Sequence, residues 1–220
     1  MPLIQHTQLL TGAQVWIWHL SETKIDFERF LNPSDISEIF HKIPHETRQL
    51  QKMATRALLH QLNPVKRIDI QYDELGAPGL NGHEGHISIS HCRTHVGLLY
   101  HPLERCGLDL EELSPRVLKI APRFLNETEK NWIRPDKNLE EITLIWSTKE
   151  AMFKTLGGGG IHFSADLIVY EPFFTNPESG HGEALYQGHK GKIAFEYHFK
   201  YLDGVLMVHT IAKRTKSEVA

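Results

Sequence analysis

One stretch in the middle of the chain limits the possible folds more than any other, and it covers residues 87–111. It opens with residues 87–91, Ile-Ser-Ile-Ser-His, and closes with residues 106–111, Cys-Gly-Leu-Asp-Leu-Glu. Successive side chains of a β-strand point to opposite faces. We therefore expect Asp109 and Glu111 on one face of a strand and the leucines between them on the other. Two carboxylates held by an apolar strand predict a site for a hard divalent cation such as Mg²⁺.

Two segments have the spacing of long helices. Residues 46–62 carry apolar side chains at helical intervals, and residues 141–156 form the strongest helical pattern in the chain. The second helix runs into four glycines at 157–160, which suit a helix end followed by a flexible loop. Glu150 and Lys154 are four residues apart on this helix, so they share a face. Taken alone, such a pair is most often a surface salt bridge.

A basic stripe follows the first helix, because Arg48, Lys52 and Arg56 recur at intervals of four residues. Composition alone favours a solvated helix face for this stripe. Arg56 is the member of most interest, because the apolar residues 57–59 follow it directly.

The order of the elements indicates an α+β fold. Strands are expected at 13–20, 68–72, 87–91, 106–111, 165–170, 193–199 and 205–212. Short helices are expected at 25–31 and 34–40, a helical region at 115–133, and a loop at 136–140. Helices that alternate with blocks of mainly antiparallel strands favour α+β. The order of elements repeats, which predicts two structurally similar α/β halves, 1–104 and 105–220, although no residues match between them.

Composition narrows the class of protein. A net charge of -3 gives no reason to expect nucleic-acid binding. No apolar run reaches the length of a membrane span, and the first residues lack the pattern of a signal peptide. The two cysteines, Cys92 and Cys106, form no metal-binding or redox motif. We therefore expect a cytoplasmic protein with reduced cysteines.

Three motifs taken together resemble those of the 4'-phosphopantetheinyl transferases, in particular the larger, pseudo-dimeric group that activates peptide and polyketide synthetases. They are residues 89–91 (Ile-Ser-His), residues 107–111 (Gly-Leu-Asp-Leu-Glu) and residues 146–154 (Trp-Ser-Thr-Lys-Glu-Ala-Met-Phe-Lys), the last followed by Leu-Gly. The resemblance implies two similar α/β halves with the active site in the cleft between them. It also implies transfer of the phosphopantetheine arm of coenzyme A to a serine of an apo acyl or peptidyl carrier protein, with Mg²⁺ required and adenosine 3',5'-bisphosphate released.

The resemblance also assigns roles to residues. Asp109, Glu111 and Glu150 are the implied Mg²⁺ ligands, and oxygen ligands suit a metal that bridges two phosphates. Attack on a pyrophosphate depends mostly on positioning and charge neutralisation. Lys154 is expected to contact a phosphate oxygen and to stabilise the leaving group. Glu150 or a metal-bound water is expected to deprotonate the carrier serine. Lys149 differs from Glu150 by about 100° around the helix and is given a structural or partner role.

The nucleotide end of coenzyme A is assigned to the first half. By resemblance, Ser90, His91 and Arg56 bind it, with Arg48 as a further candidate. Without the motif, His91 would be interpreted as a core histidine bonded to backbone. One departure stands out, because the family often has Gly-Lys-Pro before the Ser-His strand and this chain has alanine at position 77. One contact to the nucleotide is therefore lost or supplied elsewhere, so weaker coenzyme A binding or a different donor range is expected.

The carrier protein is the other expected partner. Carrier domains are typically acidic, and residues 114–128 carry Arg116, Lys119 and Arg123 directly after the metal strand. An ordinary amphipathic helix would explain the same pattern equally well. A monomer is expected, since two halves already build the cleft. Two rival functions remain: a non-catalytic protein that binds coenzyme A or a carrier, and another Mg²⁺-dependent nucleotide enzyme, which the lack of a P-loop or dinucleotide motif disfavours.

Overall fold

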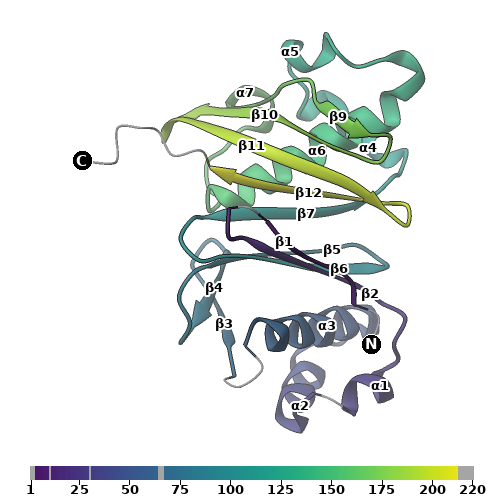
Figure 1. The fold of residues 1–220 in the computed structure, drawn as a ribbon, viewed down its shortest axis with the longest axis vertical. Coiled ribbons are helices and arrows are strands. Elements are labelled where there is room, and N and C mark those ends of the chain that lie inside the picture. The colour runs from purple at the N-terminus through teal and green to yellow at the C-terminus, as the bar shows by residue number, and fades with distance from the viewer. Residues whose placement is uncertain (1–2, 10, 30, 64–66, 213–220) are drawn as a thin grey trace.

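The computed structural model describes residues 3–9, 11–29, 31–63 and 67–212 (Figure 1). Its strands form two large antiparallel sheets and one small hairpin, and helices pack on the outer sides of the large sheets (Figure 1). The α+β class is therefore confirmed. In the described ranges, no helix is long and apolar enough to cross a membrane.

The first sheet has the strand order β1-β2-β6-β5. Its strands are β1 (Leu3–Gln8), β2 (Gln14–His19), β5 (His86–His91) and β6 (His95–His101). Beside it lies a two-stranded hairpin of β3 (Asp69–Tyr72) and β4 (Pro78–Asn81).

The second sheet has the strand order β7-β12-β11-β10-β8, with β9 paired to β10. Its strands are β7 (Cys106–Glu112), β8 (Leu167–Val169), β9 (Phe173–Asn176), β10 (Ser179–Gly188), β11 (Gly191–Leu202) and β12 (Val205–Ala212). In both sheets the strand that precedes the helices, β2 or β7, lies beside the last strand, β6 or β12. The change from one sheet to the other falls between residues 101 and 106.

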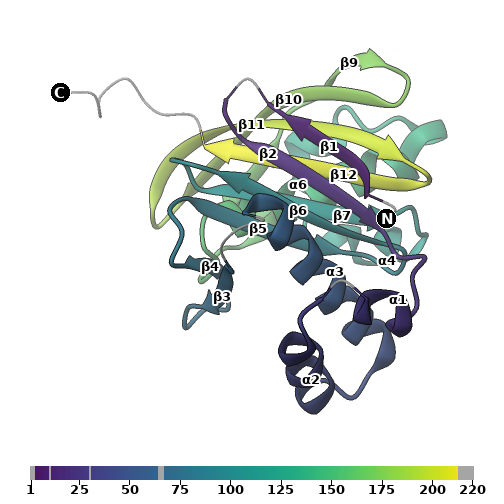
Figure 2. The same ribbon diagram turned by 60° about the horizontal axis from the view of Figure 1, so that its bottom comes forward.

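Along the sequence, the helices of each half follow the first strand or strands of its large sheet and precede the remaining strands. They are α1 (Lys24–Glu28), α2 (Pro33–Lys42), α3 (Glu46–Leu62), α4 (Arg116–Ile120), η1 (Ala121–Arg123), α5 (Glu127–Lys130), η2 (Pro135–Lys137), α6 (Asn138–Thr155) and α7 (Phe163–Asp166). The helix α3 covers the outer face of the first sheet, and α6 covers the outer face of the second (Figures 1 and 2). The resulting layers are helix, sheet, sheet and helix.

Three apolar cores hold these layers together. Trp18 and Leu58 belong to the core under α3, and Ile145 and Phe195 to the core under α6. The third core lies between the sheets, where Leu108 and its neighbours on β7 and β12 meet β2 and β6. The β6 residue that faces Leu108 is Gly97. A Cβ atom at Gly97 would lie 2.7 Å from Leu108 Cδ2, so only a glycine leaves enough room there. Burial of apolar surface at this junction joins the two sheets.

Most expected elements are present, but three differ in type or bounds, and the structure adds strands that were not expected, among them β1 and β10. The helix at 46–62 has the predicted bounds. The loop expected at 136–140 is wrong, because a 3-10 turn and the first residues of α6 occupy it. The helical region at 115–133 breaks into three short pieces, α4, η1 and α5. The strand expected at 165–170 is preceded by a helical turn and spans only 167–169.

Candidate functional site

Two serines fix the free edge of β7. Since β7 is the last strand of its sheet, its outer N–H groups have no strand to pair with. The N–H of Leu108 donates to Ser88 Oγ at 2.9 Å, and that of Leu110 donates to Ser90 Oγ at 3.1 Å. Both serines come from β5 and are two residues apart, so they share a face of that strand. These bonds place the middle of β5 and the middle of β7 side by side.

Asp109 lies at the centre of the resulting cluster. It is buried, and both of its carboxylate oxygens accept hydrogen bonds. Oδ1 accepts from Ser90 Oγ at 3.1 Å and from Lys154 Nζ at 2.8 Å, and Oδ2 accepts from Ser147 Oγ at 2.8 Å. The predicted alternation along β7 is confirmed, because Leu108 and Leu110 point into the core between the sheets. Asp109 instead faces α6.

A glycine allows α6 to lie close to this face of β7. A Cβ atom at Gly107 would stand only 1.8 Å from the backbone oxygen of Ala151 and 2.5 Å from Thr155 Oγ1. Any other residue would therefore push the helix away from the strand. The close approach brings Ser147 and Lys154, seven residues apart on one side of α6, within bonding distance of Asp109.

Two more carboxylates complete the cluster. Burial raises the pKa of Glu111 to about 7, helped by the charges of Asp109 and Glu150, while a hydrogen bond from Trp146 acts in the opposite direction. Burial and the charge of Asp109 also raise the pKa of Glu150, and Lys154 opposes that shift. The like-charge repulsion shows that Asp109, Glu111 and Glu150 lie within electrostatic reach of one another.

The donor chemistry of this cluster suits a hard divalent cation, because its ligating atoms are carboxylate oxygens and a cation would relieve their repulsion. Across the described ranges, however, no group of three acidic, histidine or cysteine side chains is already arranged to hold a metal ion. The cationic group that contacts Asp109 is the ammonium of Lys154, which also donates to the Leu108 carbonyl oxygen at 2.8 Å. The residues therefore fit the metal by their chemistry, with a lysine in contact with the central carboxylate.

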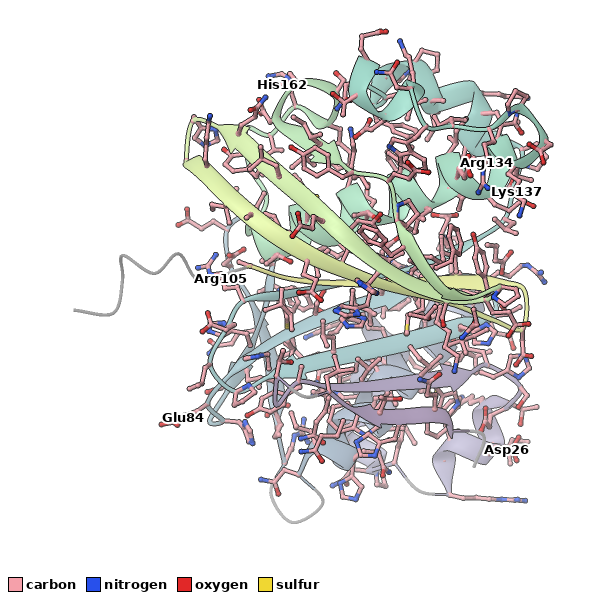
Figure 3. The ribbon with its side chains drawn as sticks, turned by 45° about the horizontal axis from the view of Figure 1, so that its top comes forward. Asp26, Glu84, Arg105, Arg134, Lys137 and His162 are labelled. Carbon is pink, nitrogen blue, oxygen red and sulfur yellow. The ribbon has the colours of Figure 1, made fainter. Side chains whose placement is uncertain are left out.

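A groove of about 610 Å³ opens beside the cluster. Its walls come from α3, the β3–β4 hairpin and β5 on one side, and from the start of β7 and the end of α6 on the other. Arg48, Lys52, Arg105 and Lys154 line it, and Figure 3 shows Arg105 at the level where the two sheets meet. The one acidic residue in the lining, Asp73, accepts hydrogen bonds from two backbone N–H groups of its own loop. The groove is therefore basic in a protein of net charge -3.

His91 and Arg48 meet on the wall of this groove. Nη1 of Arg48 donates to Nε2 of His91, which makes the imidazole an acceptor and therefore neutral at that nitrogen. Burial lowers the pKa of His91, and the charges of Arg48, Lys154 and Lys52 lower it further. The residue keeps an exposed surface, although its surroundings partly desolvate the ring, so it lies on a cationic wall rather than in a core.

The structure separates two predicted site residues from the groove. Arg56 lies one turn beyond Lys52 on α3, where it pairs with Asp69 at 3.0 Å and Asp35 at 3.8 Å, and it does not line the groove. Ser90 is buried against Asp109 and does not line it either. Of the basic stripe, Arg48 and Lys52 face the groove and Arg56 is committed to ion pairs within its own layer.

Several functional neighbours escaped prediction. Ser147 and Trp146 lie inside a motif, yet nothing in their spacing indicates that they bond Asp109 and Glu111. The role of Ser88 could have been predicted, since it precedes Ser90 by two residues and therefore lies on the same face of the strand. Ala77, which replaces the common lysine, lies on the groove wall.

Lys149 has the structural role that was one of its two expected roles. Its Nζ is fully buried and bonds Glu129, the Phe124 carbonyl oxygen at 2.6 Å and the Phe163 carbonyl oxygen at 2.8 Å. On the surface nearby, the side chains of Arg116, Lys119 and Arg123 are exposed, as a docking face requires.

Comparison with known proteins supports the resemblance. Residues 105–207 match the family model of the 4'-phosphopantetheinyl transferase superfamily. The chain is 34% identical over 122 residues to the 4'-phosphopantetheinyl transferase AcpT of Escherichia coli strain K12, an alignment that covers 52% of this chain and 62% of AcpT. It is 30% identical over 108 residues to the transferase gsp of Aneurinibacillus migulanus, covering 46% of this chain and 44% of gsp.

A further relative is the 4'-phosphopantetheinyl transferase Sfp of Bacillus subtilis, 25% identical over 142 residues, with 60% of this chain and 63% of Sfp covered. The chain thus aligns with less than two thirds of the length of these relatives. The predicted resemblance to the superfamily, including Sfp itself, is confirmed. Asp109, Glu111, Glu150 and Lys154 all lie within the part that matches the family model.

Proposed function

We propose that this protein transfers the 4'-phosphopantetheine group of coenzyme A to a serine of an apo acyl or peptidyl carrier protein, in a Mg²⁺-dependent reaction that releases adenosine 3',5'-bisphosphate. One observation carries the proposal. Lys154 bonds Asp109 in the carboxylate cluster and also lines the basic groove, so the two parts form one continuous site. A basic groove that ends in a carboxylate and lysine cluster suits a donor with several phosphates.

The donor lies in the groove, with its nucleotide end against the cationic wall. Arg48 and His91 hold the 3'-phosphate of coenzyme A and the ribose that carries it. Lys52, which bonds the Tyr72 hydroxyl at 2.7 Å, adds a further positive charge. Arg56 has no part in this binding, because its guanidinium is already paired. Ser90 acts on the donor only through Asp109 and the edge of β7.

At the reacting phosphorus, one bond breaks and one bond forms, and one proton is transferred. The carrier serine oxygen forms a bond to the phosphorus that carries the pantetheine arm, and the bond from that phosphorus to the bridging oxygen breaks. The electron pair leaves with adenosine 3',5'-bisphosphate, and the ammonium of Lys154 stabilises the charge that develops on this leaving group. Glu150 takes the serine proton, through an oxygen that does not bind the metal.

Asp109, Glu111 and Glu150 would hold the Mg²⁺ ion. When bound, the ion supplies neutralising charge for the pyrophosphate. Ser147 and Ser90 keep Asp109 in place, and the Trp146 hydrogen bond orients Glu111. Glu150 can serve both as ligand and as base only if one of its oxygens stays free of the metal, so the serine proton moves to that oxygen.

The two predicted halves, 1–104 and 105–220, form part of the proposal. One shared feature of the two large sheets supports them, since in each the strand that precedes the helices lies beside the last strand, and the groove has walls from both halves. A single chain then builds the whole cleft, so a monomer suffices. The exposed basic residues Arg116, Lys119 and Arg123 offer a docking face for an acidic carrier. The free thiols of Cys92 and Cys106 agree with a cytoplasmic location.

The test is mass spectrometry of several apo carrier proteins incubated with the protein, coenzyme A and MgCl2. We expect a mass gain of one phosphopantetheine group on at least one carrier and none when MgCl2 is replaced by EDTA. Asp109→Ala and Glu150→Gln should each abolish the gain. Glu112→Gln is the matched control, because Glu112 is also an acidic residue of β7 but bonds Thr94 on the other side of the strand, and its variant should stay active.

The alternative is a non-catalytic protein of the same fold that binds coenzyme A or a carrier. Two observations keep it in the test: Ala77 stands on the groove wall in place of a lysine, and the carboxylates are not already arranged as ligands in the described ranges. Coenzyme A binding measured by calorimetry, without transfer to any carrier, would favour this alternative and refute the proposed reaction.

A further inference from the structure

The carboxylate that should bind the metal already has a partner on every oxygen. Asp109 Oδ1 accepts from Ser90 and Lys154, and Oδ2 accepts from Ser147. Each carboxylate oxygen has two lone pairs, so Oδ1 is fully used and one lone pair remains on Oδ2. A cation on Oδ1 must replace one of its two contacts, and a cation on Oδ2 would lie beside the Lys154 ammonium and be repelled by it. Which contact it replaces determines how metal binding changes the groove.

Lys154 is the partner that can leave. Ser90 Oγ is held in place by the Leu110 N–H at 3.1 Å, and Ser147 sits on the buried side of α6. Both serines are also neutral, so they do not repel a cation. Lys154 carries a full positive charge on a flexible four-carbon stem, 27% of its side chain is exposed, and that side chain lines the groove. To leave Asp109, its ammonium also gives up its bonds to the Leu108 carbonyl oxygen at 2.8 Å and to Ser90 Oγ at 3.1 Å.

The groove offers the ammonium a second position. Lys154 lines the same groove as Arg48 and His91, on the cationic wall where a donor phosphate would bind. Without an anion there, the wall repels Lys154 and favours its contact with Asp109. A phosphate in the groove reverses this balance.

We propose that Lys154 and a divalent cation compete for Asp109, and that a bound cation transfers the Lys154 ammonium from Asp109 into the groove, onto a phosphate of the donor. The inference rests on the proposed function for the identity of the cation site. It makes cation binding and donor binding mutually favourable, because each ligand stabilises the same position of the lysine.

Metal binding without any donor tests the competition directly. We would titrate Mn²⁺, a hard cation visible by electron paramagnetic resonance, into the wild type and into Lys154→Met. We expect Lys154→Met to bind Mn²⁺ about tenfold more tightly, since the competing charge is gone. Lys52→Met is the matched control, because it removes one charge from the same groove without touching Asp109, and its Mn²⁺ affinity should stay within about threefold of the wild type.

Unchanged or weaker Mn²⁺ binding by Lys154→Met would overturn the inference, as would a wild type that binds no Mn²⁺. Circular dichroism shows whether the variant is folded. A second measurement needs no variant: amine-specific labelling of the wild type, read by peptide mass spectrometry, should label Lys154 faster when Mg²⁺ is added alone. Labelling that stays constant or slows contradicts the displacement.

The outcome differs from that of the transfer assay. If the carriers gain no phosphopantetheine but Lys154 still exchanges with the cation, the proposed reaction fails and the competition stands. If transfer occurs but Lys154→Met binds Mn²⁺ no better than the wild type, the reaction stands and the competition fails.

Discussion

The buried ion pair of Lys149 and Glu129 supplies the sharpest test of the fold around the site. Both side chains are fully buried, and Nζ of Lys149 lies 2.8 Å from Glu129 Oε1. Each oxygen of Glu129 also accepts a backbone N–H, from Asn126 at 3.0 Å and from Val169 at 3.0 Å. The pair therefore joins α6 to α5 and β8, on the same helix that carries the proposed site residues Glu150 and Lys154.

Lys149→Met leaves a buried carboxylate with two N–H donors and no countercharge. Removing one partner of a buried pair costs about 3–5 kcal/mol of unfolding free energy. Burial already raises the pKa of Glu129, with the charge of Lys149 opposing the rise, so the variant should raise it further. A raised pKa in the folded state means that the folded protein holds the extra proton. The loss should then be largest at pH 8 and smaller at pH 5.5, where Glu129 can become neutral.

Urea unfolding followed by tryptophan fluorescence at both pH values measures this difference. Lys130→Met is the matched control, because Lys130 pairs with Glu127 at 2.7 Å on the exposed surface, where such a pair contributes about 0–1 kcal/mol. A Lys149→Met variant within about 1 kcal/mol of the wild type at both pH values would refute the reasoning. A large loss independent of pH would assign the effect to packing instead of charge.

Three further predictions follow from other sites. Burial lowers the pKa of His209 to about 3 from 6.5, so the folded protein binds fewer protons than the unfolded chain and loses stability as the pH falls below about 6.5. We expect His209→Leu to reduce the drop in unfolding free energy between pH 7 and pH 5 by about 2 kcal/mol, measured by urea unfolding; an unchanged drop contradicts this. The raised pKa of Glu111, about 7, means that its ionised form destabilises the fold at higher pH. Without metal, Glu111→Gln should therefore raise the unfolding free energy at pH 8 by about 1–2 kcal/mol, a figure reduced for the partial exposure of the side chain. At pH 4 the substitution should not change the unfolding free energy. Gly107→Ala should lower the unfolding free energy by about 3 kcal/mol and abolish transfer, since its Cβ would meet α6. The control is Gly79→Ala, whose Cβ would have only an ordinary contact at 3.7 Å and whose unfolding free energy should stay within about 1 kcal/mol of the wild type. Equal losses in the two variants would refute the steric argument.

Local patterns were sufficient to predict the centre of the site. The two-residue period along β7 predicted which way Asp109 and Leu108 point, because a strand leaves only two directions. The spacing of four residues predicted that Glu150 and Lys154 share a helix face. These inferences depend on neighbours in the chain, and the structure agrees with them.

Contacts between distant segments could not be predicted in the same way. Arg56 belongs to a regular basic stripe, yet its partners Asp35 and Asp69 lie on two other elements. Nothing within α3 indicates which of its basic residues finds such a partner. The same holds for Ser147, whose bond to Asp109 exists only because α6 packs on β7.

The strand β10 was missed because its glycines resemble a loop. A Cβ at Gly180 would stand 2.7 Å from the Phe199 ring, and one at Gly182 would stand 2.5 Å from the Tyr197 ring. These glycines make room for aromatic side chains on the neighbouring strand β11. Glycines that would suggest a turn from the sequence are thus required for packing within the sheet. Their reason becomes clear only once the neighbouring strand β11 is known.

The strand β7 links the joint between the sheets to the proposed chemistry. Its leucines form the core between the sheets, and its outer N–H groups bond Ser88 and Ser90. Its other face holds Asp109 and Glu111 against α6. Since Ser90 contributes to both the joint and the Asp109 contacts, a shift of β5 relative to β7 would move the central carboxylate. Asp109 can therefore keep its position only while the two sheets keep theirs, which explains why a site so dependent on distances lies at the apolar junction of the two sheets instead of on a loop.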